Sequence, residues 1–233
     1  MHSWQLTNAA LFYFFAVIIS FANSVFAWKM RPVRGATTFS LMTFSTGIWS
    51  LGYLVGFFNA NPTWKLVMLR VEYLGASAAV LLWLLFIARY THHNQWWTRR
   101  SIGLLSVVPI ITFLLVLTAQ QQQFFYKSYG FIEQSGLIIS EKVYGPGFYV
   151  WIAYAYSCVI ASVVLLLRSM FDMPQRFRSQ IVLLILVSIL VLFPNLFFVI
   201  GLNPIAPYDP TCLSFVVVGF LMLITMKFYR FLD

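Results

Sequence analysis

Charged residues are scarce in this 233-residue chain: Asp, Glu, Lys and Arg together make up 9% of it, whereas 61% of the residues are hydrophobic. A water-soluble domain of this length has no interior large enough to hide so much apolar surface. Apolar stretches of about 18 or more residues with short polar connections are typical of helical membrane proteins. The stretches are continuous rather than alternating, which argues against a β-barrel. The sequence therefore predicts an all-α, multi-pass protein of the cell membrane (plasma or inner membrane).

Cysteine and histidine are also few. Cys158 and Cys212 both lie within apolar stretches, where we interpret them as small packing residues without a disulfide or metal role. His92 and His93 are adjacent, next to basic residues, and His2 is terminal, so no metal-ligand spacing is present. We expect neither a metal nor a cofactor.

No catalytic motif is visible in the sequence. Paired carboxylates, a nucleophile next to a base and a glycine-rich phosphate loop are all missing in a supporting context, so we expect no catalytic residues. A retinal-binding opsin is disfavoured because no lysine lies in mid-membrane for a Schiff base. The Asp-Arg-Tyr motif that eukaryotic G-protein-coupled receptors commonly carry at the end of the third span is missing as well.

Seven apolar stretches are predicted to cross the bilayer as helices. They run at about 6–28, 36–58, 66–87, 101–118, 148–167, 181–200 and 212–228. The first is interpreted as an uncleaved span rather than a secretory signal. No Lys or Arg precedes it, and Lys29, Arg31 and Arg34 follow directly, which is the reverse of the charge order in a signal peptide.

Positive charge is distributed unevenly between the two sides of the predicted bundle. If the N-terminus is external, most of the 15 Lys and Arg residues fall on the inner side. The outer side then holds Lys65, Lys127 and Lys142, with Arg70 near the outer end of the third span. An excess of Lys and Arg on the cytoplasmic side predicts an external N-terminus and a cytoplasmic C-terminus. The net charge of +9 is explained by this bias, and no nucleic-acid partner is expected.

The longest connection, about Ala119 to Gly147, is predicted to contain a short extracellular β-hairpin between the fourth and fifth spans. Tyr129–Ile132 and Leu137–Ser140 flank Gln134-Ser135-Gly136, a turn that contains glycine. Gly145-Pro146-Gly147 follows as a strong helix breaker before the fifth span.

Arg70 and Glu72 are charges at the edge of the third span without a juxtamembrane explanation. Ionisable groups at membrane depth are costly, so each is a functional hypothesis. Two residues apart on a helix, they point about 200° away from each other and cannot pair comfortably. Either Arg70 snorkels to the interface and Glu72 faces water, or one or both line an outward-facing cavity. Asp209, at the mouth of the seventh span, is a candidate partner for Arg70.

Aromatic residues of the fifth span suggest a wall for such a cavity. Trp151, Tyr154 and Cys158 share a helix face just below the Gly145-Pro146-Gly147 breaker. Aromatic stripes usually serve packing or face lipid. An aromatic-lined pocket with few polar groups is, however, the general form of a small-molecule site.

Three further positions bear on helix packing. Gly75 and Ala79 form a small-xxx-small pair that lets another helix approach closely. Pro194 removes the backbone donor to the carbonyl of Leu190 and should kink the sixth span. Asn195 beside it either forms a hydrogen bond that holds two helices together or forms a hydrogen bond to a ligand.

Taken in series, the motifs resemble the N-terminal seven-transmembrane sensor region of bacterial and archaeal histidine kinases. The matching stretches run in family order and are Arg70-Val71-Glu72-Tyr73-Leu74-Gly75, Tyr90-Thr91 with the Trp96-Trp97 pair, Val107-Val108-Pro109-Ile110, Tyr144-Gly145-Pro146-Gly147-Phe148, Tyr154-Ala155-Tyr156, Arg178-Ser179-Gln180, Pro194-Asn195, Asp209-Pro210-Thr211 and Phe228 to Asp233. Trp151 departs from the His that family members often carry, and Pro210-Thr211 from their Thr-Pro. The ligand of this chain therefore need not be the one that other family members bind.

The resemblance implies that residues 1–233 form one sensor module, expected to be cut from a longer protein whose cytoplasmic effector, a kinase or another signalling domain, is absent. A ligand in the outer half would shift or rotate the seventh span. The residues that the resemblance and the topology assign to ligand binding are Arg70, Glu72, Tyr73, Trp151, Tyr154, Asn195 and Asp209, with Pro194 and Arg230 in signal relay. The expected partners are a small-molecule or amphiphilic ligand, the lipid bilayer, the effector in cis and, by family analogy, a second copy in a homodimer.

Two other functions stay open. A purely structural anchor that dimerises a kinase would have an interior filled by side chains. A small transporter or channel would need a polar path through the bundle, yet few polar residues fall in mid-membrane. Such a transporter would also be expected to show an inverted repeat, and the two halves of the chain show none.

Overall fold

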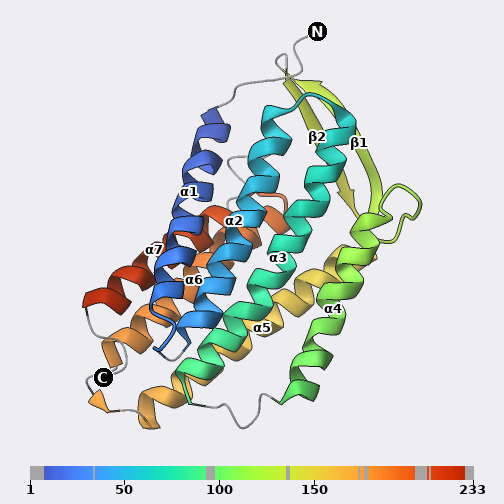
Figure 1. The fold of residues 1–233 in the computed structure, drawn as a ribbon. Coiled ribbons are helices and arrows are strands. Elements are labelled where there is room, and N and C mark those ends of the chain that lie inside the picture. The colour runs from blue at the N-terminus through green and yellow to red at the C-terminus, as the bar shows by residue number, and fades with distance from the viewer. Residues whose placement is uncertain are drawn as a thin grey trace.

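The computed structural model describes residues 8–33, 35–92, 98–134, 137–172, 174–175, 178–202, 209 and 211–228. This part of the chain forms seven α-helices and one two-stranded sheet (Figure 1). The helices are α1 (Asn8–Lys29), α2 (Ala36–Phe58), α3 (Pro62–Tyr90), α4 (Arg99–Leu117), α5 (Pro146–Asp172), α6 (Arg178–Val199) and α7 (Thr211–Phe228). Each predicted span corresponds to one helix.

Among the described residues, six helices, α1 to α6, are long and apolar enough to cross a membrane. The seventh, α7, is also apolar over Thr211–Leu221, the stretch whose side chains are described. The chain is therefore a multi-pass membrane protein. A seventh crossing, and the side of the membrane on which each end lies, stay predictions.

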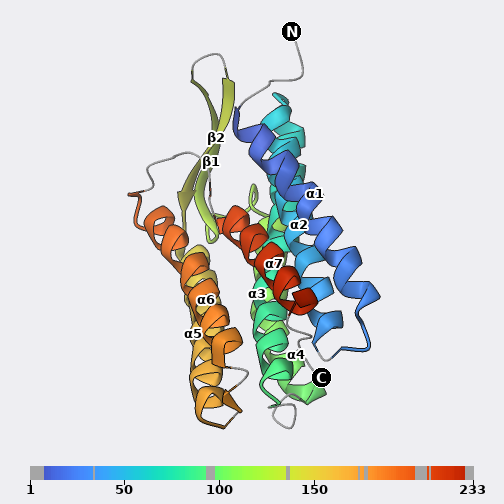
Figure 2. The same cartoon turned by 90° about the vertical axis from the view of Figure 1, so that its left-hand side faces the viewer.

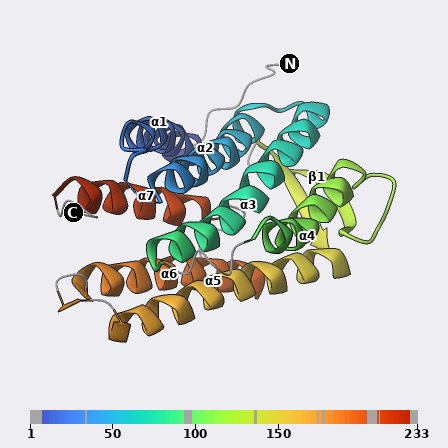
Figure 3. The ribbon, with the colours of Figure 1, turned by 60° about the horizontal axis from the view of Figure 1, so that its bottom comes forward.

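The helices lie in three layers, as Figures 2 and 3 show from two sides. The first layer holds α1 and α2, the middle layer holds α7, α3 and α4, and the third layer is the α5–α6 pair. Within this arrangement α3 packs against α2, α4 and α5, whereas α7 packs against α1, α2 and α6. The first and last helices of the chain, α1 and α7, therefore lie side by side.

The contact between α2 and α3 is especially close at Gly75. A Cβ atom added to this glycine would stand 2.5 Å from both the carbonyl oxygen of Ser45 and the backbone nitrogen of Trp49. Ala79, one turn further along α3, is fully buried. The predicted close approach of another helix at this small-residue pair is confirmed, and the partner is α2.

Helix α3 begins four residues before the predicted span. The side-chain carbonyl of Asn61 accepts a 2.9 Å hydrogen bond from the backbone N–H of Thr63, and Pro62 follows at the first helical position. Both are favourable starts for a helix, because the cap satisfies a free N–H and proline lacks one. Lys65, assigned to a loop from the sequence, therefore lies inside the first turns of α3 and is buried.

The hairpin follows α4 and precedes α5, as predicted for its place in the chain. Strands β1 (Tyr126–Gln134) and β2 (Leu137–Tyr144) are antiparallel, with Gln134 opposite Leu137 and Phe131 opposite Ser140. Strand β1 extends beyond its predicted segment at both ends, whereas β2 begins at the predicted residue and extends only beyond the predicted end. Ser135 and Gly136 of the predicted turn lie outside the described residues. The hairpin stands over the end of the bundle where α2 leads into α3 (Figure 1).

A candidate ligand-binding site under the hairpin

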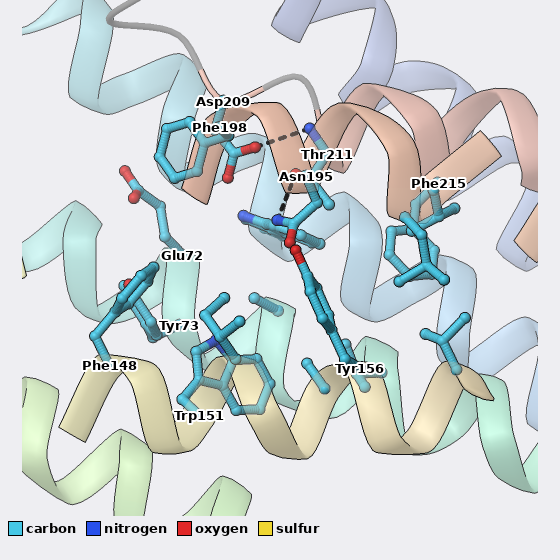
Figure 4. A pocket seen from close by; sticks show the side chains of 18 of the residues that line it. Glu72, Tyr73, Phe148, Trp151, Tyr156, Asn195, Phe198, Asp209, Thr211 and Phe215 are labelled. Carbon is cyan, nitrogen blue, oxygen red and sulfur yellow. Dashed lines mark hydrogen bonds between the residues drawn. The ribbon is translucent and has the colours of Figure 1, made fainter. Parts of the chain in front are cut away.

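A cavity lies inside the bundle near the hairpin, with walls from α2, α3, α5, α6, β2 and the start of α7. Figure 4 shows the side chains that the helices contribute to it. We call it the inner cavity. Its volume, measured as the space that the centre of a water-sized molecule can reach, is about 70 Å³. Its apolar wall includes Trp49, Ala76, Val80, Phe148, Trp151, Ala155, Val159, Val191, Leu192 and Phe215. Its polar groups come from Tyr53, Glu72, Lys142, Tyr156, Asn195, Asp209 and Thr211.

A second space, the hairpin cavity, continues from the inner cavity under the sheet. It shares Tyr53, Glu72, Lys142, Tyr144 and Phe198 with the inner cavity and is further lined by Gly56, Phe57, Lys65, Ile139 and Ser140. Its space for the centres of water-sized molecules is about 210 Å³. The polar end of the site therefore lies directly below β2.

An ion pair joins the hairpin to the bundle. The Nζ atom of Lys142 on β2 lies 3.4 Å from Oε2 of Glu72 on α3, and both side chains are largely buried. The ammonium also lies over the ring of Tyr53, 5.8 Å from its centroid. Burial by itself would lower the pKa of Lys142, but the Glu72 carboxylate outweighs that effect, and the pKa of Lys142 is raised. Lys142 is therefore charged at neutral pH.

Asp209 organises the start of α7. Its Oδ1 atom accepts a 2.8 Å hydrogen bond from the backbone N–H of Thr211, the first residue of the helix, and so satisfies one of the N–H groups that an α-helix leaves free at its start. Its Oδ2 atom accepts a 3.1 Å bond from the hydroxyl of Tyr53, and its backbone oxygen accepts one of 2.9 Å from Tyr13. Burial raises the pKa of the Asp209 carboxyl, and the hydrogen bonds from Thr211 and Tyr53 partly offset this effect.

The rings of Tyr13 and Tyr53 are stacked with their centroids 5.0 Å apart, so α1 and α2 present their hydroxyl groups together to the start of α7. Asn195 on α6 adds a further link, because its Nδ2 atom donates a 2.9 Å hydrogen bond to Oγ1 of Thr211 (Figure 4). Helices α1 and α2 are thus bonded to Asp209, just before α7, and α6 is bonded to Thr211, the first residue of α7.

Five of the predicted ligand-binding residues are brought together by the fold. They are Glu72, Tyr73, Trp151, Asn195 and Asp209, which all line the inner cavity. Pro194, predicted to act in signal relay, lies inside α6 next to Asn195. Arg230, the other predicted relay residue, lies outside the described residues.

Arg70 and Tyr154 do not line the inner cavity. The Nη2 atom of Arg70 donates a 3.1 Å hydrogen bond to the carbonyl oxygen of Leu117 on α4, and the hydroxyl of Tyr154 donates one of 2.9 Å to Leu105. Of the ion pairs in the described part of the chain, none joins Arg70 to Asp209, so that expected partnership is corrected. The cause is the helical offset of about 200° that turns Glu72 to the cavity and Arg70 toward α4.

Lys142 and Tyr156 were missed by the sequence interpretation. Lys142 was counted only as a loop charge, and no local signal connects it with Glu72, 70 positions away. The helix face predicted to wall the cavity was that of Trp151, Tyr154 and Cys158, and it did not include Tyr156. Yet Phe148, Trp151, Ile152, Ala155, Tyr156 and Val159 follow a spacing of three and four residues and line the cavity as one stripe. That spacing is a signal that the sequence did contain.

Tyr53→Phe is expected to lower the free energy of unfolding by about 1.5–3 kcal/mol, because a buried carboxylate loses a hydrogen bond donor. Denaturation of the purified protein in mixed micelles, followed by circular dichroism, measures the change. Tyr149→Phe is the matched control, since Tyr149 is 54% exposed on α5. Equal midpoints for both variants would contradict the role of Tyr53 in holding Asp209.

The sequence matches a known protein family over most of its length. A family model described as the N-terminal 7TM region of histidine kinase matches residues 12–233, which is nearly the whole chain. No curated protein matches the sequence. In the described part of the chain, no group of three or more His, Cys, Asp or Glu side chains is arranged to hold a metal ion.

Proposed function

Since the chain belongs to the family of N-terminal seven-transmembrane regions of histidine kinases, we propose that it is a sensor that binds a small ligand under the hairpin. Such a region is not itself catalytic. In this proposal, ligand binding changes the packing of the helices, and the change passes to a cytoplasmic kinase or other effector domain of the same protein. A homodimer is the form in which we expect it to act.

The observation that carries the proposal is a cavity with clustered polar groups in an otherwise apolar bundle. A purely structural anchor, which binds no ligand, does not require buried charges. Each buried charge costs free energy unless it is paired. Here Glu72, Lys142 and Asp209 converge on one space from α3, β2 and the start of α7. This arrangement supports a binding site over a dimerising anchor. The apolar remainder of the inner cavity supports it over a polar transport path.

The charges around the two cavities balance. The acids Glu72 and Asp209 are matched by Lys142 and by Lys65, whose Nζ atom donates a 2.6 Å hydrogen bond to the carbonyl of Gly56. With no formal charge left over, neither a strongly anionic nor a strongly cationic compound is favoured. The surrounding apolar wall supports a ligand that is largely hydrophobic with one polar end.

The relay is proposed to start at the first turn of α7. A ligand that contacts Asp209 or Asn195 acts on hydrogen bonds that tie α7 to α2 and α6. Pro194 next to Asn195 interrupts the backbone bonding of α6, which makes this helix easier to bend. The ligand can bias the helices only as far as its affinities for the two packings differ. Arg230, after α7, is proposed to pass on the movement.

A chimera with a histidine kinase domain tests the proposal. Thermal-shift screening of the purified domain against metabolite and lipid libraries first identifies a ligand, and autophosphorylation is then measured against its concentration. Glu72→Gln and Asp209→Asn are each expected to raise the half-maximal concentration by about 10- to 100-fold, since each removes a charged hydrogen-bond acceptor from the polar end of the site.

Glu133→Gln, at an exposed position on β1, is the matched control and should respond like the unchanged chimera. Circular dichroism establishes that each variant is folded. Unchanged responses in both Glu72→Gln and Asp209→Asn would show that the ligand site lies elsewhere. A chimera whose activity no compound alters, with full activity in both variants, would favour the structural anchor.

A further inference from the structure

An apolar groove runs along the outer face of the α5–α6 pair. It is lined by Ile160, Ile189, Phe193 and Leu196, together with Tyr156 and Leu192. Ile160 is 57% exposed and Phe193 is 61% exposed. Both helices are long and apolar enough to cross the membrane, and exposed apolar side chains on such helices are expected to contact the acyl chains of the bilayer.

Tyr156 and Leu192 line both this groove and the inner cavity. They therefore form the partition between the lipid-facing surface and the candidate binding site. Movement of these two side chains would join the two spaces without unfolding a helix. Such rotamer changes occur on short timescales. The hairpin cavity, by contrast, approaches the same site from the opposite, polar end.

The hydroxyl of Tyr156 is buried and has no hydrogen-bond partner within the described part of the protein. Its side chain extends from α5 across the cavity toward Asn195 (Figure 4). A buried hydroxyl without a partner costs about 1–3 kcal/mol. Asn195 uses its Nδ2 atom on Thr211, which leaves its carbonyl oxygen to accept a further bond. A donor and an acceptor thus stand together at the inner side of the partition.

We propose that the ligand is a single-chain amphiphile with an uncharged hydroxyl headgroup, which reaches the inner cavity from the bilayer between α5 and α6. Its headgroup bonds to Tyr156 and Asn195, and its hydrocarbon chain lies in the groove along Ile160 and Phe193. The inference rests on the proposed function, because it names the ligand class of the same cavity.

The headgroup is uncharged because of the groups that already face the cavity. Lys142 is already paired with Glu72, so neither group offers a free charge to a ligand, whereas Asp209 lines the inner cavity without an ion pair in the described part of the protein and would repel a carboxylate. A hydroxyl both donates and accepts, so it satisfies Tyr156 and Asn195 together. The small inner cavity suits one headgroup, and the groove between α5 and α6 suits one chain.

Photo-crosslinking in lipid nanodiscs tests this route. The probe is dodecan-1-ol with a diazirine near the methyl end of its chain, and labelled peptides are identified by mass spectrometry. The label is expected on the peptides of α5 and α6 that contain Ile160, Ile189 and Phe193. Excess unlabelled dodecan-1-ol should remove it, whereas dodecane and, at neutral pH, dodecanoate should not.

Two pairs of variants sharpen the test. Ile160→Trp fills the groove and should lower labelling by about fivefold or more, the equivalent of about 1 kcal/mol. Ile110→Trp on α4 starts from the same residue type with the same 57% exposure and should leave labelling unchanged. Tyr156→Phe should weaken competition by dodecan-1-ol by about fivefold, which corresponds to the loss of one neutral hydrogen bond. Tyr149→Phe should have no effect.

Four outcomes would overturn the inference. They are labelling spread evenly over the lipid-facing helices, labelling concentrated on β1 and β2, labelling insensitive to Ile160→Trp in a folded protein, and equal competition by dodecanoate. A chimera that still responds to another compound would then keep the sensor function and exclude only the lipid-side route. Conversely, specific groove labelling with a kinase that never responds would support the amphiphile site and contradict the sensor function.

Discussion

Gly75→Val is expected to lower the free energy of unfolding by more than about 3 kcal/mol, at or beyond the upper end for overpacked sites. The added Cβ would meet the Ser45 carbonyl oxygen and the Trp49 nitrogen at 2.5 Å, and the Cα atom of Trp49 at 2.8 Å. All three are backbone atoms of α2, so no side-chain rotation relieves the clash and the two helices must separate. Chemical denaturation in mixed micelles, followed by circular dichroism, measures the loss.

Gly103→Ala on α4 is the matched control for this prediction. A Cβ at Gly103 meets no atom within 4 Å, so the substitution adds only helix propensity. It should be neutral or stabilise the protein by up to about 1 kcal/mol. Similar losses in Gly75→Val and Gly103→Ala would mean that the close contact between α2 and α3 is wrong. Glu72 is one turn from Gly75, so the same variant should also weaken ligand binding.

Lys142→Met is expected to cost about 3–5 kcal/mol, because it leaves the Glu72 carboxylate buried without its cation. The hairpin should loosen from the bundle, which hydrogen exchange at the amides of β2 would detect as faster exchange. Since the pKa of Lys142 is raised, its contribution is complete at neutral pH. That contribution is lost on the alkaline side as the pH rises from the ordinary lysine pKa through this raised value.

Two comparisons separate the ion pair from a general effect of the substitution. Lys127→Met, at an exposed position on β1, should change neither stability nor exchange. The double variant Glu72→Gln with Lys142→Met should recover much of the loss, since no lone charge stays buried. Equal losses in Lys142→Met and in the double variant would contradict a coupled pair.

The candidate site was predictable in part. Asp209 precedes a proline and an apolar stretch, and Glu72 is an acid inside an apolar span, so local patterns single out both residues. Trp151 and Asn195 follow from helical spacing and from polarity in a span. Helical spacing also explains the errors. Arg70 and Tyr154 are close in sequence to Glu72 and Trp151, but their angular offset directs their polar atoms toward α4.

The membrane class, the helices and the place of the hairpin in the chain were determined by the sequence alone. The physical reason is local: a bilayer requires apolar spans whose backbone groups bond within the helix, and turn residues and caps end them. Only the tertiary structure decided which charge meets which partner. Lys142 reaches Glu72 across 70 positions, and Tyr156 divides the cavity from the lipid face. Such contacts depend on how the three helix layers pack, and no local pattern encodes a contact between residues so far apart in the sequence.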